Sequence, residues 1–191
     1  MEVPARLGRA SLRVVLLALL TLAALPTAHA WARPRCPGAN VVPTAHSVNA
    51  ARDATACLVN RERTKRGLRA LRTNRLLESS AGAYARDMVR RSFFAHVSPT
   101  GETLTERIRE DTRYLAGALR WEIGENLAWG TGSLATPAQI VRGWMRSPGH
   151  RRNILHASYR EMGLGVALGT PVDASAASGA ATYANQFGRR G

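Results

Sequence analysis

The chain has 191 residues, of which 45% are hydrophobic and 21% are charged. This length fits one domain of ordinary size with short appendages, and the balanced composition excludes a fully disordered chain. The formal net charge is +14, and Lys65 is the only lysine, so nearly all of the positive charge is arginine. Arginine binds phosphates and carboxylates well, but no run of five like charges occurs and a codon bias explains the same composition. We therefore leave an anionic partner open and expect no specific nucleic-acid binding.

The first thirty residues have the parts of a signal peptide. Three arginines precede an apolar run at residues 14–25, and residues 28–30 (Ala-His-Ala) form a small-x-small cleavage pattern. We predict residues 1–30 to be the signal, cleavage near Ala30, and a secreted mature protein. The run is shorter than the ~20 residues that cross a bilayer, and no later run comes close, so we expect no transmembrane segment in the mature chain. An uncleaved N-terminal anchor is the alternative.

The two cysteines suggest a structural bridge. Residues 31–46 contain prolines and little periodicity, so we interpret them as a leader or linker. Cys36 lies in this leader, and Cys57 lies in a predicted helix. Disulfides persist outside the cytoplasm, and a Cys36–Cys57 bond would tie the leader to the domain. Two free thiols are the alternative.

The rest of the chain predicts helices first and strands later. Apolar residues recur every three or four positions after Ser47 and Asn74, which are both good helix caps. Thr136 followed by a proline is the start signal of a later helix. The predicted elements are helices over 47–66, from 74 to at least 88, over 103–113 and from 136, then strands over 163–168 and 181–187. This order predicts an α+β domain over residues 47–191, in which helices cover a small sheet.

The common enzyme motifs are missing from the sequence. It has no G-x-S-x-G elbow, H-E-x-x-H motif, phosphate loop or G-x-G-x-x-G. Of the five histidines, one leaves with the signal and His46 lies in the leader. His96 and His150 each lie at the edge of a predicted helix, in segments rich in Ser, Pro and Gly where loops form sites. We expect His156 to be an exposed loop residue and Asn153 to bond loop backbone.

Four motifs occur in order: 94–99 (FAHVSP), 124–128 (GENLA), 149–155 (GHRRNIL) and 162–166 (MGLGV). Together they resemble the signature stretches of the CAP superfamily (cysteine-rich secretory proteins, antigen 5, pathogenesis-related 1), in its secreted bacterial SCP-like branch. The resemblance implies a three-layer α-β-α sandwich, with helices flanking a small, mainly antiparallel sheet. The chain lacks the multiple cysteines and the C-terminal extension of eukaryotic relatives, so functions carried by those extensions are not transferred.

The resemblance also implies a cleft lined by two histidines and two acidic residues. These match His96, Glu106, Glu125 and His150. Two neutral imidazoles, His96 and His150, can bind zinc or another divalent cation while carboxylates orient them. Paired acid and base groups can equally move protons.

Each cleft residue also has a purely structural interpretation. Glu106 stands three residues after Thr103, which is the spacing of a capping box. Glu125 can hold a local turn by accepting backbone N–H groups. His150 can cap a helix end, and His96 can pack in the core.

The leading hypothesis is a secreted, non-enzymatic CAP domain protein whose cleft binds a divalent metal and a small or lipid-like ligand. The alternative is a metal-dependent, peptidase-like hydrolase, in which Glu106 or Glu125 is the base for a metal-activated water. A third hypothesis, adhesion to anionic cell-wall polymers, rests on the net charge. The expected partners are thus a lipid, a sterol or a cell-wall polymer.

Overall fold

The computed structural model describes residues 35–110, 112–172 and 179–191. The predicted signal peptide and most of the predicted loop 171–179 lie outside these residues. No helix in the described part of the chain is long and apolar enough to cross a membrane. The elements are α1 Val48–Thr64, β1 Arg72–Thr73, α2 Arg75–Arg90, α3 Leu104–Glu110, β2 Trp121–Thr131, η1 Gly132–Ala135, α4 Pro137–Arg146, α5 Pro148–Ile154, β3 Glu161–Leu168 and β4 Ala180–Arg190.

The four strands form one mixed sheet in the order β1-β3-β4-β2. The short β1 runs parallel to β3, whereas β3 pairs with β4 and β4 with β2 in antiparallel fashion. The long β2 therefore lies at the sheet edge, and its register places Glu125 opposite Gln186 of β4. The sheet is mainly antiparallel, as predicted.

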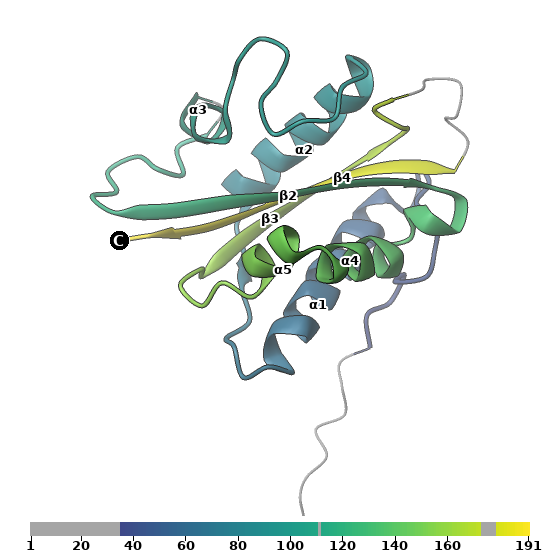
Figure 1. Cartoon of the computed structure of the whole chain (residues 1–191), viewed down its shortest axis with the longest axis horizontal. Coiled ribbons are helices and arrows are strands. Elements are labelled where there is room, and N and C mark those ends of the chain that lie inside the picture. The colour runs from purple at the N-terminus through teal and green to yellow at the C-terminus, as the bar shows by residue number, and fades with distance from the viewer. Residues whose placement is uncertain (1–34, 111, 173–178) are drawn as a thin grey trace, which may run out of the picture. The chain divides into compact units, whose positions relative to one another are not determined.

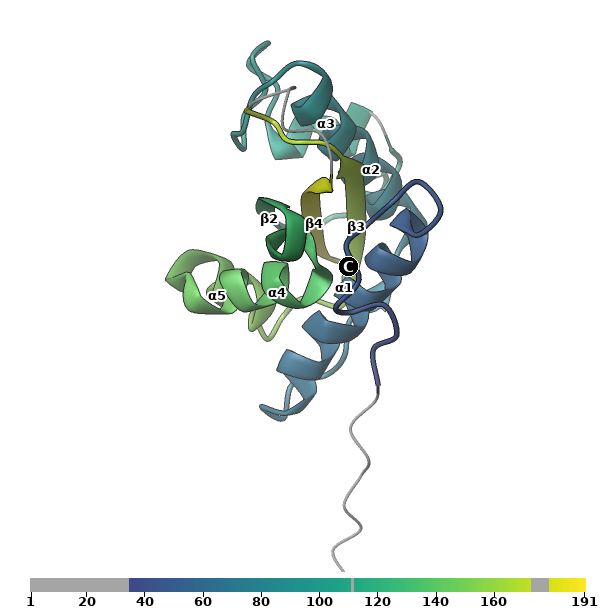
Figure 2. The same cartoon turned by 90° about the vertical axis from the view of Figure 1, so that its right-hand side faces the viewer.

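Helices cover both faces of this sheet (Figure 1 and Figure 2). The α2 and α3 helices lie on one face, and α1, α4 and α5 lie on the other. Alternating side chains of β4 serve the two cores, since Tyr183 and Phe187 pack on the α1/α4 side and Ala184 packs on the α2 side. The α+β class and the three-layer sandwich are confirmed.

Two glycines of β3 let α2 lie very close to the sheet. A Cβ atom on Gly163 would collide with the backbone at Leu77, and one on Gly165 would collide with the backbone at Ala81. A side chain at either position would push the helix away from the strand. The position of α2, and of Tyr84 that it carries, is therefore fixed by this contact.

The leader is tied to the domain from its first described residues. Cys36 and Cys57 form a disulfide with a Cα–Cα distance of 5.7 Å, which confirms the predicted bridge. The backbone N–H of Ala138 in α4 also donates to the carbonyl of Ala39 at 2.8 Å. Closing a loop of this size stabilises the fold by about 3 kcal/mol in the chain-entropy model.

The strand β2 was not predicted from the sequence. Residues 121–131 contain two glycines and an asparagine, which have low strand propensity, and they become a strand because they pair with β4 along its length. Glu125 therefore lies in the middle of a strand, and the turn interpretation for it is wrong. The predicted helices and the other two long strands lie close to their expected positions.

Candidate functional site

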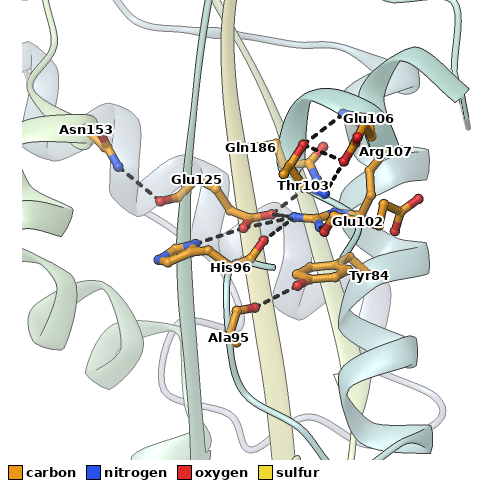
Figure 3. Close-up of polar contacts among 10 residues, drawn as sticks. All are labelled: Tyr84, Ala95, His96, Glu102, Thr103, Glu106, Arg107, Glu125, Asn153 and Gln186. Atoms are coloured by element: carbon orange, nitrogen blue, oxygen red, sulfur yellow. Dashed lines mark hydrogen bonds and ion pairs between the residues drawn. The ribbon is translucent and has the colours of Figure 1, made fainter. Parts of the chain in front are cut away.

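His96 lies in the loop between α2 and α3 and contacts the edge strand. Its side chain is 58% exposed, so it is not the packed core histidine that was one interpretation. Its Nδ1 atom lies 2.9 Å from Oε1 of Glu125 (Figure 3). A carboxylate only accepts hydrogen bonds, so Nδ1 carries the proton and donates it. In the neutral ring, Nε2 then keeps a free lone pair.

Glu125 is held by a buried ion pair. The side chains of Glu125 and Arg107 are each only 2% exposed. Nη2 of Arg107 donates to both carboxylate oxygens of Glu125, at 3.2 and 3.1 Å, and Nε2 of Gln186 donates to Oε2 at 3.4 Å. Both oxygens of Glu125 are therefore engaged, and the carboxylate has little freedom to turn away from His96.

Arg107 and Tyr84 together hold the loop that carries His96. Arg107 donates to the carbonyl of Glu102 at 3.1 Å and to that of His96 at 3.2 Å. Its guanidinium carbon lies 3.3 Å from the centre of the Tyr84 ring, and the Tyr84 hydroxyl donates to the carbonyl of Ala95 at 2.7 Å (Figure 3). Burial raises the pKa of Tyr84 to about 12, so this hydroxyl remains a neutral donor at ordinary pH.

His150 is the third residue of α5, the short helix that packs against β2. Asn126 of β2 donates to the carbonyl of His150 at 2.9 Å. Asn153, one helical turn further on, donates to Oδ1 of Asn126 at 2.9 Å and to the carbonyl of Glu125 at 3.0 Å. Asn153 thus bonds strand backbone rather than the loop backbone expected. Two adjacent residues of β2 therefore position the two histidines, Glu125 for His96 and Asn126 for His150.

The environment of His150 favours its neutral form. Burial lowers the pKa of His150, and the electrostatic interaction with His96 lowers it further. The structure thus pairs His96 with Glu125 and leaves His150 near enough to His96 for an electrostatic interaction, while the proposed four-residue cleft stays a prediction. A neutral imidazole is the form that binds metal ions.

Glu106 is bonded elsewhere. Its Oε2 accepts from the backbone N–H of Thr103 at 2.7 Å and from the Thr103 hydroxyl at 2.8 Å, which is a capping box at the start of α3. These two hydrogen bonds lower the pKa of Glu106, which is exposed to solvent. Among the described residues, the Glu106 side chain forms hydrogen bonds only with Thr103. The capping interpretation is confirmed.

The donor set for a metal ion is small. Within residues 35–110, 112–172 and 179–191, no three His, Cys, Asp or Glu side chains gather in an arrangement that could hold a metal. The carboxylate of Glu125 is already engaged, so the protein ligands would be the imidazoles of His96 and His150. Such a set leaves positions for water or a bound molecule, as catalytic and exchangeable metal sites do.

The sequence analysis missed three residues that support this site, namely Tyr84, Arg107 and Gln186. Tyr84 falls on the apolar face of the helix predicted after Asn74, where the sequence alone indicates a core residue. Gln186 is one of three polar residues, with Thr182 and Asn185, in the predicted strand 181–187, and a long amide beside Phe187 in a buried strand is a usable signal. Arg107 gave no signal, because an arginine in a short helix is normally solvated.

The comparisons with known proteins agree with this fold. The family model described as CAP, the cysteine-rich secretory protein family, matches residues 57–187. The chain therefore belongs to the CAP family. This establishes the class of domain that the four motifs indicated.

Particular relatives are bacterial. The chain is 35% identical over 119 residues to the uncharacterized protein YkwD of Bacillus subtilis, a match that covers 62% of this chain and 43% of YkwD. It is 25% identical, with a TM-score of 0.60, to an extracellular SCP-domain protein of Bacillus anthracis, covering 76% of this chain and 43% of the other. An outer surface protein of Borrelia burgdorferi shares the fold at 21% identity and a TM-score of 0.58, covering 71% and 90%. The chain spans less than half the length of YkwD.

Proposed function

We propose that this chain is a secreted CAP-domain protein that binds a divalent metal ion, zinc by preference, between His96 and His150. The observation that carries the proposal is the hydrogen bond from Nδ1 of His96 to the buried carboxylate of Glu125. Histidines that bind metals almost always donate their other ring N–H to a carboxylate, a carbonyl or water, which fixes the tautomer and the ring orientation. Nε2 of His96 is the ligand atom in this arrangement.

The second ligand in this proposal is His150. Its lowered pKa keeps the imidazole neutral at pH values where an ordinary histidine becomes protonated, so protons compete less with a metal ion. A metal held by two imidazoles supplies a Lewis acid with exchangeable positions. Small or lipid-like molecules, including a sterol or part of a cell-wall polymer, are the ligands we propose for those positions.

The two acidic candidates support a binding role over hydrolysis. A general base needs a carboxylate oxygen within reach of the attacking water. Both oxygens of Glu125 accept from Arg107, and Glu106 accepts from Thr103 at the start of α3. Glu125 lies beside His96 but both of its oxygens are engaged, and Glu106 caps a helix, so we propose a non-enzymatic module.

Secretion is supported by three observations. The N-terminal thirty residues have the pattern of a signal peptide. The Cys36–Cys57 disulfide is typical of proteins outside the reducing cytoplasm. The similar protein of Bacillus anthracis is described as extracellular.

Zinc titration calorimetry on the purified protein tests the metal proposal. Both His96→Ala and His150→Ala should weaken zinc binding at least about tenfold, since each removes one ligand. His46→Ala is the matched control, because His46 is exposed in the leader and should leave the affinity unchanged. Unaltered zinc binding in both cleft variants would refute the proposal.

The same variants test the hydrolase alternative. The protein is assayed with zinc against a broad panel of peptides and esters. We expect no turnover. Turnover that is lost in both His150→Ala and Glu125→Gln would replace the binding role with a hydrolytic one.

A further inference from the structure

Three arginines surround a depression beside α4 and α5 that is separate from the histidine site. Arg146 is the last residue of α4, and Arg151 and Arg152 lie on α5. The depression has a volume of about 570 Å³, and Leu155 and His156 also line it. No acidic residue lies among its lining residues.

The charge of these arginines is not neutralised by the protein. Some arginines elsewhere pair with acids, as Arg107 does with Glu125 and Arg91 with Asp87, whereas others such as Arg69 are exposed and scattered. Within the described ranges, the side chains of Arg146, Arg151 and Arg152 form no hydrogen bond or ion pair, all three residues are exposed, and all three line the same depression. Three unpaired cations around one depression repel each other, and a bound anion would relieve this repulsion.

The helix that carries two of them is held firmly. Asn153 ties α5 to β2 through its hydrogen bonds to Asn126 and to the backbone of Glu125. Because one side of α5 is fixed against the strand, the backbone that carries Arg151 and Arg152 is held rigidly. A rigid support lowers the entropy cost of binding.

The depression also offers apolar surface. Leu155 lines it, and the ring of His156 is stacked on Tyr159 with centroids 4.5 Å apart. Guanidinium groups bind phosphate oxygens through paired hydrogen bonds, while apolar side chains suit the carbon units between phosphates. A single phosphate ion would fill little of this volume and would use few of the donors.

We propose that this arginine groove, formed by Arg146, Arg151 and Arg152, binds a polymer whose units are joined by phosphodiesters. Successive phosphates of one chain contact the three guanidinium groups, and the linking units lie on Leu155 and His156. The groove needs no metal ion. It therefore gives the protein a second binding site that works independently of His96 and His150.

The test measures binding of fluorescently labelled poly(glycerol phosphate) to the purified full protein at low salt. The triple variant Arg146→Gln/Arg151→Gln/Arg152→Gln should bind at least about tenfold more weakly, because charge-assisted hydrogen bonds are lost. The matched control is Arg69→Gln/Arg113→Gln/Arg120→Gln, which removes the same charge from exposed side chains that form no bonds to described residues. The control should bind within about twofold of the wild type. Circular dichroism checks that both variants are folded.

Three results would overturn the proposal. Equal losses in the two triple variants would show that net charge alone attracts the polymer. Competition by inorganic phosphate at the same phosphate concentration, as strong as by unlabelled polymer, would show a site for single anions. Binding to phosphatidylglycerol vesicles that needs these arginines, without polymer binding, would show a membrane surface instead.

The proposals for the arginine groove and for the histidine site can be tested independently. The groove variant should keep the zinc affinity of the wild type, and His96→Ala should keep its affinity for the polymer. Loss of polymer binding in His96→Ala as well would contradict the independence of the two sites.

Discussion

The two acidic residues that the family resemblance assigns to one cleft have very different surroundings. Glu125 is buried in β2 and accepts from Arg107, Gln186 and His96. Glu106 is exposed at the start of α3 and forms a capping box with Thr103. The family resemblance thus indicates which residues to examine, while the surrounding strand or helix decides the role of each. Glu125 positions a histidine, and Glu106 stabilises a helix end.

The largest effect is expected when the buried pair is broken. Arg107→Met should lower the free energy of unfolding by about 3–5 kcal/mol, because it leaves the carboxylate of Glu125 buried without its counter-charge. Urea unfolding followed by circular dichroism measures this. The double variant Arg107→Met/Glu125→Leu should recover part of the loss. A loss below about 1 kcal/mol in the single variant would mean that the pair is not truly buried.

A smaller effect is expected at Asn153, on the opposite side of β2. Asn153→Ala removes the donor to both Asn126 and the carbonyl of Glu125, so the free energy of unfolding should fall by about 1–3 kcal/mol. Asn40→Ala is the control, since Asn40 is exposed and should change stability by less than about 0.5 kcal/mol. Equal effects in the two variants would show that α5 is not held through Asn153.

His150 should make stability depend on pH. Its pKa is lowered in the folded protein, so the unfolded chain binds more protons between that lowered pKa and the ordinary value of about 6.5. The stabilising contribution is complete above about pH 6.5 and is lost as the pH falls through the lowered pKa. In denaturant titrations, the wild type should lose more stability than His150→Gln between about pH 7 and pH 5. Parallel curves for the two proteins would contradict this.

Glu106 should give the smallest effect. Glu106→Gln weakens the capping box, so we expect a slightly lower melting temperature at neutral pH and an unchanged zinc affinity. Because the pKa of Glu106 is lowered, the contribution of its carboxylate is present above the ordinary pKa of glutamate and is lost as the pH falls through the lowered one. Zinc calorimetry on Glu106→Gln measures whether Glu106 contributes to metal binding. A clear loss of zinc affinity in this variant would show that Glu106 acts at the histidine site and is not only a helix cap.

Much of the fold could be predicted from the sequence because its signals are local. The helical spacing places α1 and α2 well, and Asn74 caps α2 by accepting from the backbone N–H groups of Leu76 and Leu77. Ser47 precedes α1 as predicted, but its hydroxyl accepts from the Thr44 N–H and makes no cap hydrogen bond. The strand β2 was missed because Gly124, Asn126 and Gly130 weaken its strand pattern and only pairing with β4 makes it a strand.

The site was partly predictable because some of its residues lie in local sequence motifs. The motifs named His96, Glu125 and His150, and the structure shows the hydrogen bond between His96 and Glu125. They did not show that Arg107 neutralises Glu125, because this contact joins a helix to a strand that local patterns do not connect. The role of Glu106, in contrast, could be read from its spacing to Thr103, since a capping box is a local motif.

The tautomer of His96 tests the central claim most directly. Long-range proton–nitrogen NMR of the metal-free protein at neutral pH identifies which ring nitrogen carries the hydrogen. The hydrogen bond to Glu125 predicts a protonated Nδ1 and a bare Nε2, whose resonance shifts when zinc is added. A hydrogen on Nε2 with a bare Nδ1 would contradict the account, because Glu125 would then not orient His96 as a ligand.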